Sequence, residues 1–147
     1  MLLIGTRNTL PQTVLTNGII NLGTVYRRFC KKNSCGNPAF AASGTQITIQ
    51  TAGIYHVTAT LVGSGTAAGD ATVQLTANGV AIPGALATET ITTAGTETRT
   101  FVIDHYVLVD RACTLGINAT TPVTLALVNA GVGATFATAT LNIEKVV

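Results

Sequence analysis

Between Thr45 and Pro83 the chain alternates apolar and polar residues so regularly that the segment fits β-strands and not a helix. A strand with one buried face has this period of two. The dipeptide Asn78-Gly79 separates two of these runs and predicts a tight hairpin, because a type I′ turn needs positive φ at both central residues. The alternating apolar positions are Ile47, Ile49, Tyr55, Val57, Ala59, Leu61, Val73, Leu75 and Ala77.

The rest of the chain continues this pattern, and no window carries a long 3.6-residue period. Short strands separated by Gly, Asn, Asp or Pro are typical of a sandwich or barrel. We therefore predict an all-β protein. The last strand is too apolar to fray and is expected to pair in the middle of a sheet. The predicted strands are residues 19–29, 45–50, 53–62, 71–77, 89–93, 98–109, 113–119, 124–128 and 137–146.

The chain carries unusually little charge for a soluble domain. Charged residues make up 10% of it, against roughly 25% in an average domain. Small monomers depend on surface charge to stay apart, so much of the outer surface is expected to be covered by other copies. Two strands, residues 101–109 and 125–128, lose the clean alternation, as strands covered on both faces do.

The charge is also unevenly spread. Residues 1–69 hold five cations and no acid, whereas residues 70–147 hold three cations and six acids. Turn signals punctuate residues 1–38, and we predict an attachment arm with a first strand there, followed by one domain over residues 39–147. The arm would meet an acidic partner. The attachment residues predicted are the apolar anchor Leu2, Leu3 and Ile4 and the cations Arg7, Arg27, Arg28, Lys31 and Lys32.

No group of residues forms a catalytic or cofactor-binding constellation. Asp104 and His105 are neighbours in a predicted strand and point to opposite faces, so they do not share a site. The histidines, His56 and His105, show no metal-ligand spacing. The basic residues 27–32 are a small footprint for nucleic acid, and an acidic protein surface is the favoured partner. We expect a protein that is not an enzyme and that binds no cofactor, metal or nucleic acid.

Cys30 and Cys35 leave three alternatives open: free thiols, a local disulfide or, least favoured, metal ligands. Their segment is basic, and a disulfide in the cytoplasm would form late if it formed at all. No run approaches the roughly 20 apolar residues of a membrane span. The apolar start at residues 1–4 is too short for a signal-peptide core. The chain is therefore expected to be made in the cytoplasm and to remain there until it assembles.

Three motifs, in their order and spacing, resemble a known family. They are Gly-Ile-Tyr at 53–55, Asn-Gly-Val at 78–80 and Ile-Glu-Lys-Val at 143–146. Residues 40–147 resemble the trimeric tumour-necrosis-factor-like jelly roll. The likeness is strongest to its bacterial and phage versions, such as the globular ends of exosporium collagen-like glycoproteins and phage head-fibre or decoration proteins. The resemblance implies an antiparallel jelly-roll sandwich and a homotrimer whose inner sheets pack around the threefold axis.

These observations together predict a structural protein of a bacteriophage. It would be a homotrimeric capsid decoration or head-fibre protein, attached to the major capsid protein or another particle protein, on the outer surface of the virion. One alternative is a spore- or cell-surface module, although the collagen-like stalk usual in such proteins is absent from this sequence. Another is a carbohydrate- or receptor-binding module, against which stand the lack of Trp and an aromatic content of 5%.

Overall fold

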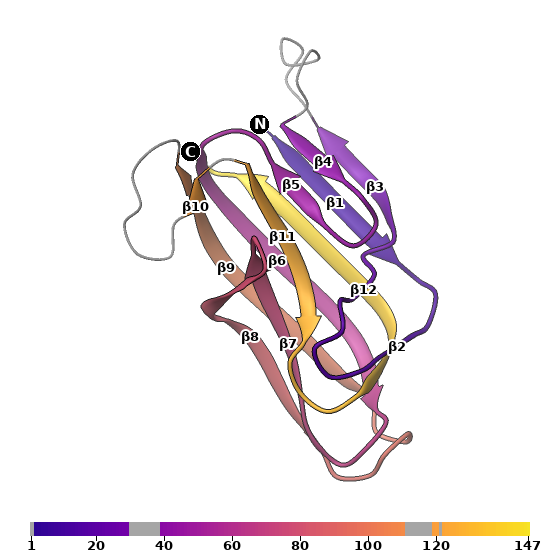
Figure 1. The fold of residues 1–147 in the computed structure, drawn as a ribbon. Helices are drawn as coiled ribbons and strands as arrows, with labels where there is room; N and C mark the ends of the chain where they lie inside the picture. The colour runs from indigo at the N-terminus through magenta and orange to yellow at the C-terminus, as the bar shows by residue number, and fades with distance from the viewer. Residues whose placement is uncertain (1, 30–38, 111–118, 121) are drawn as a thin grey trace.

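The computed structural model describes residues 2–29, 39–110, 119–120 and 122–147, and within them the chain forms two sheets packed face to face (Figure 1). Sheet A has the order β10 (Ala119–Thr120), β9 (Arg99–Asp110), β6 (Gly53–Gly65), β12 (Ala134–Lys145), β1 (Leu3–Asn8) and β3 (Thr24–Phe29), and β2 (Gln12–Val14) also pairs with β12. Sheet B has the order β4 (Phe40–Ala42), β5 (Ile47–Ile49), β11 (Val123–Asn129), β7 (Gly69–Ala77) and β8 (Val80–Ile91).

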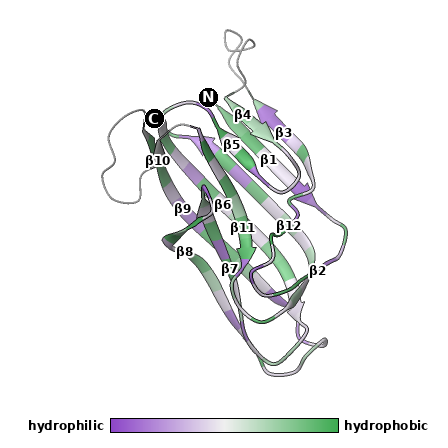
Figure 2. Ribbon diagram, viewed as in Figure 1, coloured by the Kyte–Doolittle hydropathy of each residue, from purple (hydrophilic) through white to green (hydrophobic). Residues whose placement is uncertain are grey.

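The prediction of an all-β antiparallel jelly-roll sandwich is confirmed. All strand pairs are antiparallel except β10 with β9, and the described residues contain no helix. One core lies between the sheets, formed by the inward residues of every long strand. Figure 2 shows the apolar bands along these strands. The largest fully buried side chains include Tyr55, Phe40, Phe101, Phe136, Ile4, Leu61 and Leu75.

Tyr55 shows how the core accepts a polar group. The ring packs edge-on against Phe40 at 5.9 Å. The hydroxyl lies 2.6 Å from the Thr51 hydroxyl and donates to the Thr51 carbonyl at 2.7 Å. Burial raises the pKa of Tyr55, because a low-dielectric surrounding disfavours the phenolate. The hydroxyl is satisfied at the edge of the core, so the residue is structural.

The hairpin at Asn78-Gly79 is confirmed, with φ of 50° and 80° at the two residues. The strand that follows is much longer than the predicted 89–93, because β8 begins at Val80 and continues through a bulge at Pro83 and Gly84. The side-chain amide nitrogen of Gln74 lies 2.8–3.0 Å from the carbonyl oxygens of Leu75, Ile82 and Ala85. This amide holds the bulge, which a sequence pattern of period two does not reveal.

The predicted strand 19–29 is only partly present. Residues 24–29 form β3, but the preceding residues run along sheet B, where Ile20 donates a backbone hydrogen bond to Leu127 at 2.9 Å. The chain then returns to sheet A at Gly23, whose φ is 74° and whose Cβ would stand 2.1 Å from the Arg7 carbonyl oxygen. Only glycine fits this close turn. The predicted strand 113–119 lies outside the described residues apart from Ala119.

The prediction that a separate domain begins at residue 39 is wrong for the part of residues 1–38 that the structure describes. β1 lies inside sheet A, between β12 and β3. Lys145 donates a backbone hydrogen bond to Leu2 at 2.9 Å, and Ile4 is fully buried. The sequence concealed this strand because Gly5, Thr6 and Arg7 interrupt its apolar start. The prediction that the last strand pairs in mid-sheet is confirmed, since β12 has β6 on one side and β1 with β2 on the other.

Glu97 closes the connection from β8 in sheet B to β9 in sheet A. Its carboxylate accepts hydrogen bonds from the backbone of Thr92 and Thr93, from the Thr92 hydroxyl and from Arg99. The hydrogen bond from the Thr92 hydroxyl is the main cause that lowers the pKa of Glu97, because it favours the ionised carboxylate. Glu97 is therefore a loop-closing residue, although its carboxylate remains at the surface.

If β1 is an interior strand, two substitutions on its inward face should change stability in opposite directions. Ile4→Ala should lower the free energy of unfolding by roughly 2–5 kcal/mol, through lost burial and a cavity. The Thr6 hydroxyl is buried without a hydrogen-bond partner among the described residues, so Thr6→Val should raise stability by about 1 kcal/mol. Denaturant unfolding measures both. A separate arm would leave both values unchanged, and Leu10→Ala, at an exposed position, is the control.

We expect the Glu97 carboxyl to titrate below its ordinary pKa, and Thr92→Val to raise that pKa by removing the main hydrogen bond. The sign follows from the lowered folded pKa: the contribution to stability is present above the unfolded pKa and is lost as pH falls. An NMR titration of the side-chain carbons measures the shift. An unchanged pKa in the Thr92→Val variant would show that the loop is not closed in this way.

Candidate functional site

The two outer faces of the sandwich differ in chemistry. The face of sheet A that points away from the core, here called the outer face of sheet A, exposes large apolar side chains from three strands, β3, β6 and β9. Sheet B exposes only Val80 and Leu86 of this kind among its described strands. Large apolar side chains gathered on one face of a sheet mark a candidate interaction site. The exposed apolar residues on the outer face of sheet A are Tyr26, Phe29, Ile54, Val102, Tyr106 and Leu108.

The strand register arranges this outer face in rows that run across the strands. One row reads Asp104, Thr58, Asn142, Gly5 and Arg27 from β9 to β3. The next row reads Tyr106, His56, Glu144, Leu3 and Phe29. Threonines fill much of the remaining surface, so charged groups stand mainly at the two sides of the face. The arrangement suits contact with another protein surface.

A polar and aromatic cluster lies on the β9 side. The Nε2 of His56 is 2.6 Å from Oδ1 of Asp104. The His56 ring stacks on Tyr106 with centroids 4.8 Å apart and planes at 22°. Asp104 comes from the strand position next to His105 but faces the opposite way. The prediction that Asp104 and His105 share no site therefore agrees with the structure, and Asp104 contacts His56 instead.

A second cluster lies on the β3 side. Tyr26 donates to Oδ1 of Asn142 at 2.7 Å, and the Arg7 guanidinium lies 4.3 Å from the centre of its ring. Gly5 makes room for this ring, because a Cβ there would stand 2.9 Å from a Tyr26 ring carbon and 2.5 Å from the Asn142 oxygen. Tyr26 occupies a bulge in the pairing of β3 with β1. The cluster places Tyr26 and Arg7 on the outer face.

The predicted attachment residues lie in different environments in the structure, some in the core and some on the outer face of sheet A. Ile4 is fully buried and Leu2 packs against the core, so the predicted apolar anchor at the start of the chain is wrong for these two residues. Leu3 points to the outer face in a half-buried position, and Arg7 and Arg27 are exposed there. Arg28 points inward and donates to the Phe40 carbonyl, which ties β3 to sheet B.

Four of the predicted residues, Lys31, Lys32, Cys30 and Cys35, lie outside the described residues. Their roles in attachment and in a disulfide stay predictions. No group of three or more His, Cys, Asp or Glu side chains that could hold a metal ion occurs in the described part of the chain. No helix that could cross a membrane occurs there either.

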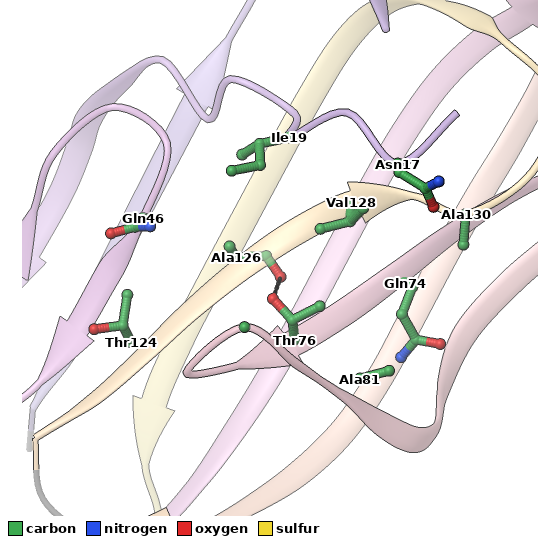
Figure 3. Close-up of a pocket in the computed structure, with 11 residues that line it drawn as sticks. Asn17, Ile19, Gln46, Gln74, Thr76, Ala81, Thr124, Ala126, Val128 and Ala130 are labelled. Carbon is green, nitrogen blue, oxygen red and sulfur yellow. Dashed lines mark hydrogen bonds between the residues drawn. The ribbon is translucent and has the colours of Figure 1, made fainter. Parts of the chain in front are cut away.

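A shallow pocket of about 380 Å³ lies on the opposite side of the molecule, over sheet B (Figure 3). Its lining mixes amides and hydroxyls with small apolar groups, and includes Asn17, Ile19, Gln74 and Thr76. Thr76 donates to the Ala126 carbonyl at 3.3 Å. Ala126, on the side of β11 that faces away from the core, lines this pocket and is 6% exposed, and residues 17–20 continue sheet B beside β11, where Ile20 donates a backbone hydrogen bond to Leu127.

The sequence did not predict that Asp104, Tyr106 and His56 form one cluster on the outer face of sheet A. It showed only that Asp104 and the histidines lack a catalytic or metal-binding arrangement. In β9 the buried residues Phe101, Ile103, Val107 and Val109 alternate with exposed ones, so the apolar residues that break the alternation of the sequence, such as Val102 and Leu108, lie on the exposed face. Large apolar residues at the exposed phase of a strand indicate a contact surface.

The comparisons with known proteins show the fold. No family model matches the chain, and no curated protein matches it. The globular domain of zebrafish complement 1qA protein is similar over 100% of this chain and 98% of its own, with a TM-score of 0.64 at 7% identity. Murine APRIL is similar over 99% and 98%, with a TM-score of 0.66 at 7% identity. The PRD1 vertex protein P5 is similar over 99% and 97%, with a TM-score of 0.57 at 12% identity.

These identities are low, so the likeness establishes the architecture alone. The chain has the jelly-roll fold shared by tumour-necrosis-factor-like and complement 1q-like domains. The match covers nearly the whole chain, which extends the predicted domain of residues 39–147 back to the first described strand.

Proposed function

We propose that this chain is a non-enzymatic structural protein of a bacteriophage particle, which stands on the outer surface of the virion as a homotrimer. The observation that carries the proposal is the outer face of sheet A, where exposed apolar and aromatic side chains lie on a neutral, threonine-rich surface. This face is the one that the resemblance to tumour-necrosis-factor-like jelly rolls turns toward a threefold axis.

The energetics favour covering this face. Val102 and Tyr106 are 58% and 59% exposed in the single chain, and burying apolar surface gains roughly 25 cal/mol per Å². An obligate interface buries about 2,000 Å² or more and is more apolar than an ordinary surface. The low overall charge means that little like-charge repulsion opposes association. A second copy of this chain satisfies these requirements.

Two likenesses support the phage assignment. The sequence motifs resemble phage head-fibre and decoration proteins. One similar structure is the vertex protein P5 of phage PRD1. Attachment to a capsid protein would then fall to polar residues outside the trimer surface, because Ile4 and Leu2 are occupied by the core. Lys31 and Lys32 keep the predicted role of meeting an acidic shell.

The first test is the mass of the protein in solution. Light scattering at micromolar concentration should give three times the chain mass of 15.0 kDa. Val102→Glu places a charge in the apolar outer face of sheet A and should yield monomers. Val80→Glu, at an exposed position on β8 in sheet B, is the matched control and should leave the mass unchanged. A monomeric wild-type protein would overturn the proposed trimer.

The second test locates the protein on its particle. Electron microscopy of particles from the parent phage should show threefold density on the outer surface of the virion. Lys31→Glu combined with Lys32→Glu should leave the trimer intact and reduce its occupancy on the particle, since these charges would then repel an acidic shell. If purified particles lack the protein while a glycan array binds it, the carbohydrate-binding alternative replaces the phage structural role.

A further inference from the structure

We propose that neighbouring copies in the assembly meet in a matched register, with Asp104 of one copy against Arg27 of the next and Tyr106 against Phe29. The proposal rests on the proposed trimer and names the groups that set its geometry. It comes from the rows on the outer face of sheet A, in which residues with complementary chemistry stand at the two ends.

The first of these rows carries opposite charges at its ends. Asp104 on β9 is opposite Thr58, Thr58 is opposite Asn142, and that row continues through Gly5 to Arg27 on β3. Four strand spacings of about 4.8 Å separate β9 from β3, or about 19 Å in all. The two charged groups therefore cannot meet within one copy.

The adjacent row carries aromatic rings at its ends. Tyr106 on β9 and Phe29 on β3 are 59% and 53% exposed. The register joins them through His56, Glu144 and Leu3. Each ring stands directly beside the charged residue of the first row. Each side of the face thus presents one charge and one ring, with charges of opposite sign.

Rotational symmetry brings these ends together. In a closed ring of identical copies, each contact joins two different surface patches. A rotation about an axis that runs along the strands leaves each row at its own height. The β9 end of a row in one copy therefore meets the β3 end of the same row in the next. A twofold axis that joined two β9 edges would instead set Asp104 against Asp104, which like-charge repulsion disfavours.

Both charged groups are available for this contact. The Asp104 side chain is 64% exposed although it contacts His56. Arg27 is exposed, and no ion pair within the described residues involves it. Inclusion in an interface would remove water from both groups and strengthen their attraction. The adjacent rings would exclude water around the pair, as apolar contacts do around interface hot spots.

A charge exchange tests the contact. Arg27→Asp and Asp104→Arg should each weaken the trimer about tenfold or more in its dissociation constant, measured by sedimentation equilibrium. The double variant restores opposite charges and should recover at least most of the wild-type affinity. Asp70→Arg is the matched control: Asp70 is exposed on β7 in sheet B and, like Asp104, contacts one side chain, that of Thr90. It should leave the constant unchanged.

The outcomes separate this proposal from the proposed function. Suppose that the wild type is a trimer and that the loss of affinity in the double variant equals the sum of the losses in the two single variants. That result would overturn the register and leave the trimer standing. A wild type that is monomeric throughout would overturn the trimer itself. Circular dichroism of each variant establishes that the sandwich is folded. A second cycle with Tyr106→Ala and Phe29→Ala should show non-additive losses if the rings meet, and additive losses would contradict the aromatic row.

Discussion

The pairing of β12 on both of its edges is the constraint on which the rest of the molecule depends. This strand joins β6 on one side to β1 and β2 on the other, and so connects the two ends of the chain inside one sheet. Its inward residues, Leu141 and Ile143 among them, are fully buried. Its register with β1 and β6 also decides which outward side chains share a row. The contact surface is therefore a consequence of the same hydrogen bonds that hold the fold.

The low charge of the surface has two different explanations on the two sheets. On sheet B, threonine hydroxyls pair across strands, as between Thr72 and Thr88 at 2.9 Å and between Thr48 and Thr124 at 3.2 Å. Cross-strand pairs of this kind contribute to sheet stability without charge. On sheet A, rings and aliphatic side chains occupy outward positions on β3, β6 and β9 and remain exposed among threonines. The uncharged polar groups of sheet B thus form hydrogen bonds within the chain, whereas the exposed apolar groups of sheet A are available to a partner.

The similarity to solved structures separates architecture from chemistry. Identities of 7% to 12% accompany an alignment over nearly the whole chain, so the fold persists while its surface residues differ. Core positions need only be apolar and of suitable size. The function of this chain must therefore be argued from its own surface, where Asp104, Tyr106, Arg27 and Phe29 carry the argument.

The sequence by itself determined the all-β class, the hairpin at Asn78-Gly79 and the central place of the last strand, and the resemblance of its motifs implied the jelly roll. The first of these follow from local alternation and turn chemistry, which short windows contain. Tertiary structure decided the rest. It placed residues 3–8 inside a sheet, although their short apolar start resembled an arm, because their partners lie more than a hundred residues away in β12. It also brought Asp104 to His56 and set Arg27 in the same row as Asp104, since strand register is fixed by packing and hydrogen bonding across the whole sheet.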